Sequence, residues 1–137
     1  MSTSTLSARP SVDTDFLRTA LRMDGWGTGG FGIVMLAGAA ALSGPLGLPT
    51  SWSIPFGVAM VGGGLALLLI AGYPELVPGH VNAVIGVNAA SAVALVVLAF
   101  SGVIDLTGLG VVFLLIGAVW VVVFAGLEAR GVRRAGL

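Results

Sequence analysis

The sequence predicts an all-α membrane protein, namely a four-helix antiparallel transmembrane bundle with a short amphipathic helix at its N-terminal side. The first observation is composition, because 57% of the 137 residues are hydrophobic and only 9% are charged, whereas about a quarter of a soluble domain is charged. The second is four apolar segments, each long enough to cross about 30 Å of hydrocarbon. The third is the glycine and proline between these segments, which end helices and turn the chain.

The predicted membrane helices occupy residues 24–43, 53–72, 80–101 and 106–128. The breaks between them are short, so consecutive helices are expected to lie antiparallel. Membrane-spanning β-strands would need alternating polar positions, which these segments lack. The sequence therefore predicts a single transmembrane domain over residues 24–128.

Shorter segments flank this domain. Residues 1–10 are polar and predict a disordered tail, and residues 129–137 predict a basic cytoplasmic tail. Within residues 11–23, apolar and charged side chains recur at helical spacing, which is typical of an amphipathic helix lying on the inner leaflet. A plain N-terminal extension of the first membrane helix explains the same spacing, and both interpretations stay open.

The positive charges predict the topology. All arginines lie near the two ends of the chain, and lysine is absent. An even number of crossings places both ends on one side of the bilayer, and the positive-inside rule makes that side the cytoplasm. The high content of alanine, glycine, valine and arginine is typical of a GC-rich bacterial genome, so we expect a multi-pass protein of the bacterial inner membrane. The lipid bilayer is the expected partner, and nothing in the charge pattern suggests a nucleic-acid groove.

The stretch "DGWGTGGFG" (residues 24–32) contains glycines with the G-x-G-x-x-G spacing of dinucleotide-binding loops. Such a loop needs a buried strand before it and an acidic residue about twenty positions later. The preceding "FLRTALRM" is amphipathic rather than strand-like, and "GPLGLPT" (residues 44–50) contains no acid. We therefore interpret the glycines as helix-packing residues and expect no bound cofactor.

Small residues let helix backbones approach closely in lipid, where apolar side chains gain little by leaving the acyl chains. The candidate packing residues form faces on three helices. They are Gly25, Gly29 and Gly32 on the first helix, Gly63 on the second, and Gly86 and Ala90 on the third. These faces pack either within one chain or against a second copy or another membrane protein, and both alternatives stay open.

Few polar side chains fall inside the apolar segments. Asn88 and Ser91 are three residues apart on one face of the third helix, where they either bridge helices or line a polar path. His80 is the only histidine and cysteine is absent, so we expect no metal site. No catalytic constellation of nucleophile, base and acid is recognisable, which disfavours an enzyme.

Asp24 and Glu128 are expected at the cytoplasmic ends of the first and fourth helices. At a helix start, the Asp24 carboxylate caps exposed N–H groups. Both acids are expected to form ion pairs with Arg22, Arg130 or Arg133, as an ionic group at the cytoplasmic face. No charged residue lies near the middle of any predicted span.

Several short motifs of this chain resemble those of a known protein family. The stretch "RMDGWGTG" (residues 22–29), Asn88, "TG" at residues 107–108 and "FAGLE", which ends at Glu128, resemble an uncharacterised family of small bacterial four-helix integral membrane proteins. The likeness covers the four helices and leaves out the polar tail. An aromatic residue that often follows the asparagine in that pattern is absent from "NAASAV" here. The resemblance implies a fold and a membrane location, and it brings no substrate.

These observations favour a non-catalytic integral membrane protein, a packing or accessory module that associates through its small-residue faces. The alternative is a small-solute transporter or channel acting as a homo-oligomer. Because a four-helix bundle fills its own interior with side chains, such a path is expected between copies of the chain.

Overall fold

The computed structural model describes residues 2–137, with side chains from Thr14 onward, and within this range it is all-helical. The helices are α1 (Ser2–Ala37), α2 (Ala39–Leu46), α3 (Thr50–Gly72), α4 (Pro78–Ser101) and α5 (Gly108–Ala135). The side chains of the predicted polar tail, residues 1–10, lie outside the described part, and that disorder stays a prediction.

Three of these helices, α3, α4 and α5, are long and apolar enough to cross a membrane. The part of α1 from Thr14 onward passes the same test together with α2, but the two helices meet at an angle of 88°. The described chain thus has three candidate spans, or four if the bent pair is one span. This pattern indicates a multi-pass membrane protein.

Gly38 separates α1 from α2. An uninterrupted first membrane helix over residues 24–43 was expected, and that expectation is wrong. The Gly38 N–H still bonds to the Val34 carbonyl at 2.8 Å, and its own carbonyl accepts from Leu42 at 2.8 Å, so hydrogen bonding continues through the bend. A Cβ atom on Gly38 would lie 2.9 Å from the Val34 carbonyl oxygen, which explains why glycine stands at this position.

Thr107 joins the end of α2 to the start of α5. Its hydroxyl donates to the Pro45 carbonyl at 2.6 Å, and its N–H donates to the Leu46 carbonyl at 3.0 Å. The same hydroxyl accepts from the Gly110 N–H at 3.1 Å and so caps α5. A Cβ on Gly110 would collide with the Leu46 carbonyl, so glycine is needed for this close approach.

Glycines from two helices form the contact between α1 and α3. A Cβ on Gly64 would lie 2.7 Å from the Gly25 carbonyl oxygen and from the Gly29 backbone. A Cβ on Gly32 would lie 2.8 Å from the Gly57 carbonyl oxygen. The predicted packing face of the first helix is therefore used inside the chain, where it lets two backbones touch.

The remaining candidate packing residues lie elsewhere. Gly63 and Gly86 have open space where a Cβ would stand, and Ala90 is exposed. None of the three therefore packs closely against another helix within the described chain. They stay candidates for contacts outside it.

The predicted segment 11–23 belongs to α1, which continues through it without a break. Leu17 and Leu21 are fully buried in the apolar cluster that joins α1 to α3 and α4. Of the two interpretations left open, the extension of the first helix is the one that the backbone shows. The Arg18 guanidinium reaches the C-terminal end of α3, donating to the carbonyls of Ala71 at 2.7 Å, of Pro74 at 2.8 Å and of Tyr73.

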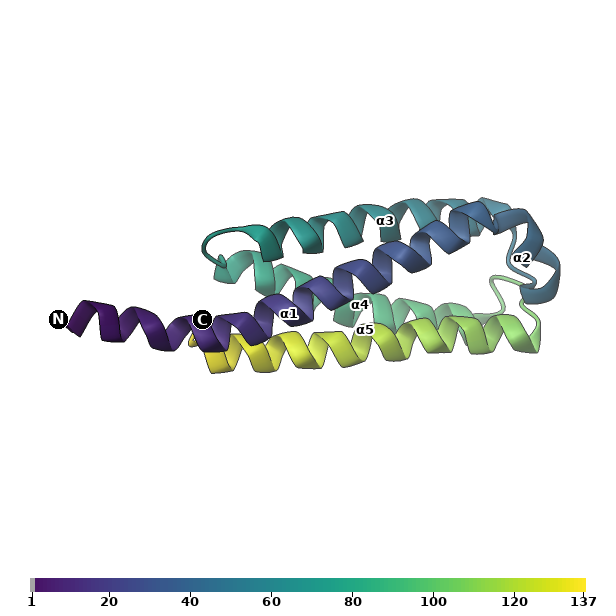
Figure 1. The fold of residues 1–137 in the computed structure, drawn as a ribbon. Coiled ribbons are helices and arrows are strands. Elements are labelled where there is room, and N and C mark those ends of the chain that lie inside the picture. The colour runs from purple at the N-terminus through teal and green to yellow at the C-terminus, as the bar shows by residue number, and fades with distance from the viewer. Residues whose placement is uncertain (1) are drawn as a thin grey trace.

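Two apolar clusters hold the helices at opposite ends of the molecule. One lies near the turn between α3 and α4 and contains Leu17, Leu21, Leu67, Ala71, Leu76 and Val81. The other lies at α2 and the turn between α4 and α5 and contains Met35, Leu46, Leu48 and Ile104 (Figure 1). Between these clusters α1 packs against α3 and α5, and α4 packs against α5, whereas α3 and α4 barely touch.

Candidate functional site

Three polar side chains from three helices meet between the apolar clusters. Asn88 of α4 donates through one nitrogen, Nδ2, to Asp24 Oδ2 of α1 and to Glu128 Oε1 of α5, each at 2.9 Å. Both carboxylates are fully buried, and Asn88 is only 8% exposed. Two acids far apart in the sequence thus share a single donor away from solvent. We call these residues the Asp24–Asn88–Glu128 cluster.

The two carboxylates differ in their further partners. Asp24 Oδ1 accepts from the Thr28 hydroxyl at 2.9 Å, one helical turn away, and from Trp120 Nε1 at 3.4 Å. Glu128 Oε2 is buried and has no hydrogen-bond partner among the described residues. The Asp24 carboxylate therefore accepts three hydrogen bonds, whereas the Glu128 carboxylate accepts one, from Asn88.

Gly27 allows Trp120 to reach Asp24. A Cβ at this position would collide with the six-membered ring of the indole. The Trp120 ring also packs on Phe124, with ring centroids 4.6 Å apart. A glycine on α1 and an aromatic pair on α5 therefore position the indole N–H at the carboxylate.

The expected roles of Asp24 and Glu128 at helix ends are wrong. Because α1 begins at Ser2, Asp24 lies in the helix interior and has no free N–H groups to cap. Because α5 continues to Ala135, Glu128 lies about two turns before its end.

The predicted ionic group at the cytoplasmic face does not form around these acids. The hydrogen bonds of both carboxylates go to uncharged groups instead of arginines, and Arg22 and Arg130 are exposed. Both acids are instead buried within the protein, which their expected places at helix ends did not predict.

Burying two ionised carboxylates that share one donor costs electrostatic free energy. Transferring an ion out of water costs several kcal/mol, on the order of 20 in the idealised limit, and two like charges at short range oppose each other's ionisation. A neutral amide donor offsets only part of this cost. The arrangement therefore suits a bound proton or a bound cation better than two free negative charges.

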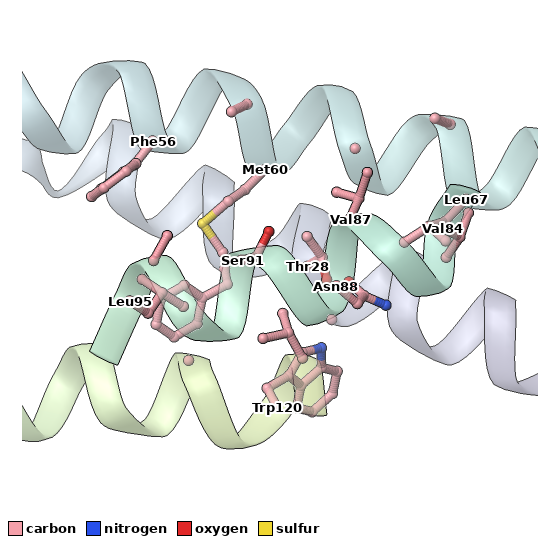
Figure 2. Close-up of a pocket in the computed structure, with 18 of the residues that line it drawn as sticks. Thr28, Phe56, Met60, Leu67, Val84, Val87, Asn88, Ser91, Leu95 and Trp120 are labelled. Atoms are coloured by element: carbon pink, nitrogen blue, oxygen red, sulfur yellow. The ribbon is translucent and has the colours of Figure 1, made fainter. Parts of the chain in front are cut away.

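A cavity of about 860 Å³ adjoins this cluster. It lies where α3 and α4 separate, and its wall is mostly apolar, with polar groups contributed by Thr28, Tyr73, His80, Asn88 and Ser91. Figure 2 shows Thr28, Asn88 and Trp120 gathered at one place in the wall, with Phe56 and Leu95 farther along it. Because these three residues also contact Asp24, they form the layer between the cavity and the buried carboxylates.

The predicted pair Asn88 and Ser91 therefore lies at the cavity, and Asn88 also belongs to the polar cluster. Both residues line the cavity, and Asn88 in addition bridges α4 to α1 and α5. Of the small residues, Gly63 lines the cavity from α3. The sequence left two alternatives open for this pair, bridging between helices and the lining of a polar path. Asn88 bridges three helices and also lies in the cavity wall.

Thr28 and Trp120 were missed as site residues. A local signal existed for Thr28, because it follows Asp24 by four residues and so lies on the same helix face. Nothing in the sequence linked Trp120 to Asp24, because contacts between α1 and α5 depend on the tertiary packing. Asp24 and Glu128 were linked only as members of an ionic group with arginines.

Among the described residues, no group of three or more histidine, cysteine, aspartate and glutamate side chains could hold a metal ion. No known family model, curated protein or solved structure matches the chain. The resemblance to small bacterial four-helix membrane proteins therefore stays a prediction. Function has to be argued from the cluster and the cavity.

Proposed function

We propose that this chain is a membrane carrier for a small solute, in which Asp24 and Glu128 together hold one exchangeable proton. The observation that carries the proposal is the shared hydrogen bond, in which both buried carboxylates accept from Asn88 Nδ2. Ionisable residues within membrane helices are costly and commonly mark ion paths and proton relays. Helix packing alone does not require a pair of them.

The proton belongs on Glu128 in this proposal. Asp24 accepts hydrogen bonds from Thr28, Asn88 and Trp120, so both of its oxygens have donors. Glu128 accepts from Asn88 alone and has a buried, unpartnered Oε2. With one proton bound, the pair carries a net charge of −1 and avoids the repulsion between two carboxylates.

The proposed topology counts the bent pair α1 and α2 as one span. Four crossings would then form an antiparallel bundle with both ends of the chain on one side. The C-terminus lies at the end of the molecule toward which α1 projects its N-terminal part (Figure 1), and the arginines are confined to the two ends of the chain. These features support a cytoplasmic location for both ends and an inner-membrane location in a bacterium.

A packing or accessory module is the second candidate. Gly86 and Ala90 of α4 favour it, because both are exposed and a Cβ at Gly86 would meet nothing within 4 Å. They are free to contact a second copy or another membrane protein. Gly25, Gly29 and Gly32 of α1, by contrast, already lie against α3. In neither candidate does the chain catalyse a covalent reaction.

The proton on the carboxyl pair is testable by infrared spectroscopy of the protein reconstituted in lipid bilayers. A protonated carboxyl group has a C=O stretching band that an ionised carboxylate lacks. We expect this band at neutral pH in the wild type and not in Glu128→Gln. Glu75→Gln is the matched control because Glu75 is exposed, and it should leave the band unchanged. A wild-type protein without the band, or a Glu128→Gln variant that keeps it, would refute the proposal.

A further inference from the structure

We propose that the cavity between α3 and α4 binds an organic monocation, an ammonium group on a compact apolar body, in exchange for the proton of the carboxyl pair. This inference rests on the proposed carrier function and specifies the solute that is carried. It is based on the cavity wall, on the position of the Asn88 amide and on the charge of the site.

The cavity wall suits the apolar part of such a ligand. Its volume of about 860 Å³ falls in the range of small-molecule sites, roughly 300–1,000 Å³. Aromatic side chains from three helices contribute to the wall, namely Phe31, Phe56, Phe113 and Trp120. The faces of aromatic rings attract cations, and most strongly where water is excluded.

Asn88 Nδ2 marks the place for the ligand nitrogen. This atom lies 2.9 Å from an oxygen of each carboxylate, and Asn88 is part of the cavity wall. The carboxylates lie behind the cavity wall, so the Asn88 side chain has to turn aside when the ligand binds. An ammonium nitrogen that then takes the position of Nδ2 would meet both carboxylates at hydrogen-bond distance. An ammonium group also has more hydrogens to donate than the amide, which would give Glu128 Oε2 the donor that it lacks.

The charge of the site balances in this exchange. The singly protonated pair carries −1. When the ammonium ion enters, the O–H bond of the carboxyl group breaks and its proton leaves to water, while no covalent bond to the ligand forms. Two carboxylates with one monocation again carry −1, so the buried charge does not change.

Among the described residues, the side chains hydrogen-bonded to Asp24 and Glu128 are all uncharged. On α1, Arg18 is bonded to the α3 terminus and Arg22 is exposed. The next arginine on α5, Arg130, is exposed as well. The sequence of α3 contains no titratable residue, and His80 is the only one in α4. His80 lines the cavity at the turn that joins α3 to α4, where its ring centroid lies 5.9 Å from that of Tyr73.

A neutral apolar molecule or a lipid chain could fill the same cavity, and matched ligands distinguish these occupants. The probe is 1-naphthylmethylammonium, and its neutral counterpart is 1-naphthylmethanol. Both are titrated into the purified protein in mild detergent, by calorimetry in two buffers of different ionisation enthalpy, which counts the protons released. We expect the ammonium to bind at least about tenfold more tightly than the alcohol, with release of one proton per ligand.

Two pairs of variants locate the binding site. Glu128→Gln should weaken ammonium binding by at least about tenfold and abolish proton release, whereas Glu75→Gln should change neither. Ala94→Phe fills the cavity, since Ala94 lines it, and should abolish binding without touching the carboxyl pair. Its matched control is Ala89→Phe, because Ala89 is exposed on the same helix outside the cavity wall.

The possible outcomes separate the two proposals. Equal affinity for ammonium and alcohol, no ammonium binding, or binding that Ala94→Phe leaves intact would overturn this inference. If the infrared band of Glu128 is still present in that case, the proton site and the carrier proposal stand with a different solute. If the band is absent, the carrier proposal itself fails.

Discussion

Asp24 of α1 and Glu128 of α5 accept hydrogen bonds from the same nitrogen atom, Nδ2 of Asn88, each at 2.9 Å. This relationship ties three helices together at a point where both acids are fully buried. It also lies against a cavity of about 860 Å³. Removing the shared donor should therefore affect both stability and ligand binding.

Asn88→Leu removes that donor and leaves two buried carboxyl groups without it. We expect the free energy of unfolding to fall by about 2 kcal/mol, because hydrogen bonds to charged groups are strong and an unpaired buried partner adds a penalty. Unfolding in mixed detergent micelles measures the change. Ser91→Ala, on the same face of α4, is the control and should change little. Equal stability of the two variants would contradict the bridging role of Asn88.

The loss of stability caused by Asn88→Leu should depend on whether the Glu128 carboxyl group is present. Combining Asn88→Leu with Glu128→Leu removes a buried acid together with its donor, and replacing both partners by apolar groups can be nearly neutral. We expect the double variant to be more stable than Asn88→Leu alone. Additive losses in a double-mutant cycle would show that the two side chains do not interact.

The contact between α1 and α3 predicts opposite effects for two adjacent glycines. Gly64→Ala places a Cβ 2.7 Å from the Gly25 carbonyl oxygen, so the backbones must separate and the free energy of unfolding should fall by about 1–3 kcal/mol. Gly63→Ala meets nothing within 4 Å and should be neutral or slightly stabilising, because alanine is the better helix former. The same unfolding assay compares them, and a reversed order would contradict the interface.

Thr107 is predicted to hold α2 against α5. Thr107→Val keeps the shape but removes the hydroxyl that caps α5 and donates to Pro45, and we expect a loss of about 1 kcal/mol. Amide hydrogen exchange in α2 should rise at the same time. Thr50→Val is the control, because Thr50 is exposed at the start of α3. Unchanged exchange in α2 would contradict this role.

The topology is testable because the chain contains no cysteine. A single cysteine introduced by Ser51→Cys is expected outside the cell, and one introduced by Ala135→Cys inside. In intact cells, a membrane-impermeant maleimide should label the first variant and label the second only after the membrane is opened. The reverse pattern would contradict the proposed orientation.

The apolar helices were predictable from the sequence because their signal is local. The predicted segment 53–72 corresponds to α3 (Thr50–Gly72) and the segment 80–101 to α4 (Pro78–Ser101). Turn residues such as Gly102, which has a φ of 78°, end these helices, and such residues are recognisable in the sequence.

The first helix and the polar cluster were not predictable in the same way. Because polar residues such as Arg18 precede the apolar run, the first helix was predicted to start later than it does. The bend at Gly38 depends on how α2 packs against α5. The contact between Asp24 and Glu128 depends on the approach of α1 to α5, and no local pattern reports it. A carboxylate is an ordinary residue at a helix end, and only the packed structure shows that these two are buried.

In the proposed carrier, Glu128 is neutral at physiological pH because it shares its site with Asp24. The carboxyl ¹³C chemical shift in protein labelled only at glutamate and embedded in lipid bilayers reports this state directly. The chain contains two glutamates, so Glu75, exposed in a loop, serves as an internal reference. The account predicts the shift of a protonated acid for Glu128 and that of a carboxylate for Glu75 at neutral pH. Two carboxylate shifts, in protein free of any bound cation, would contradict it.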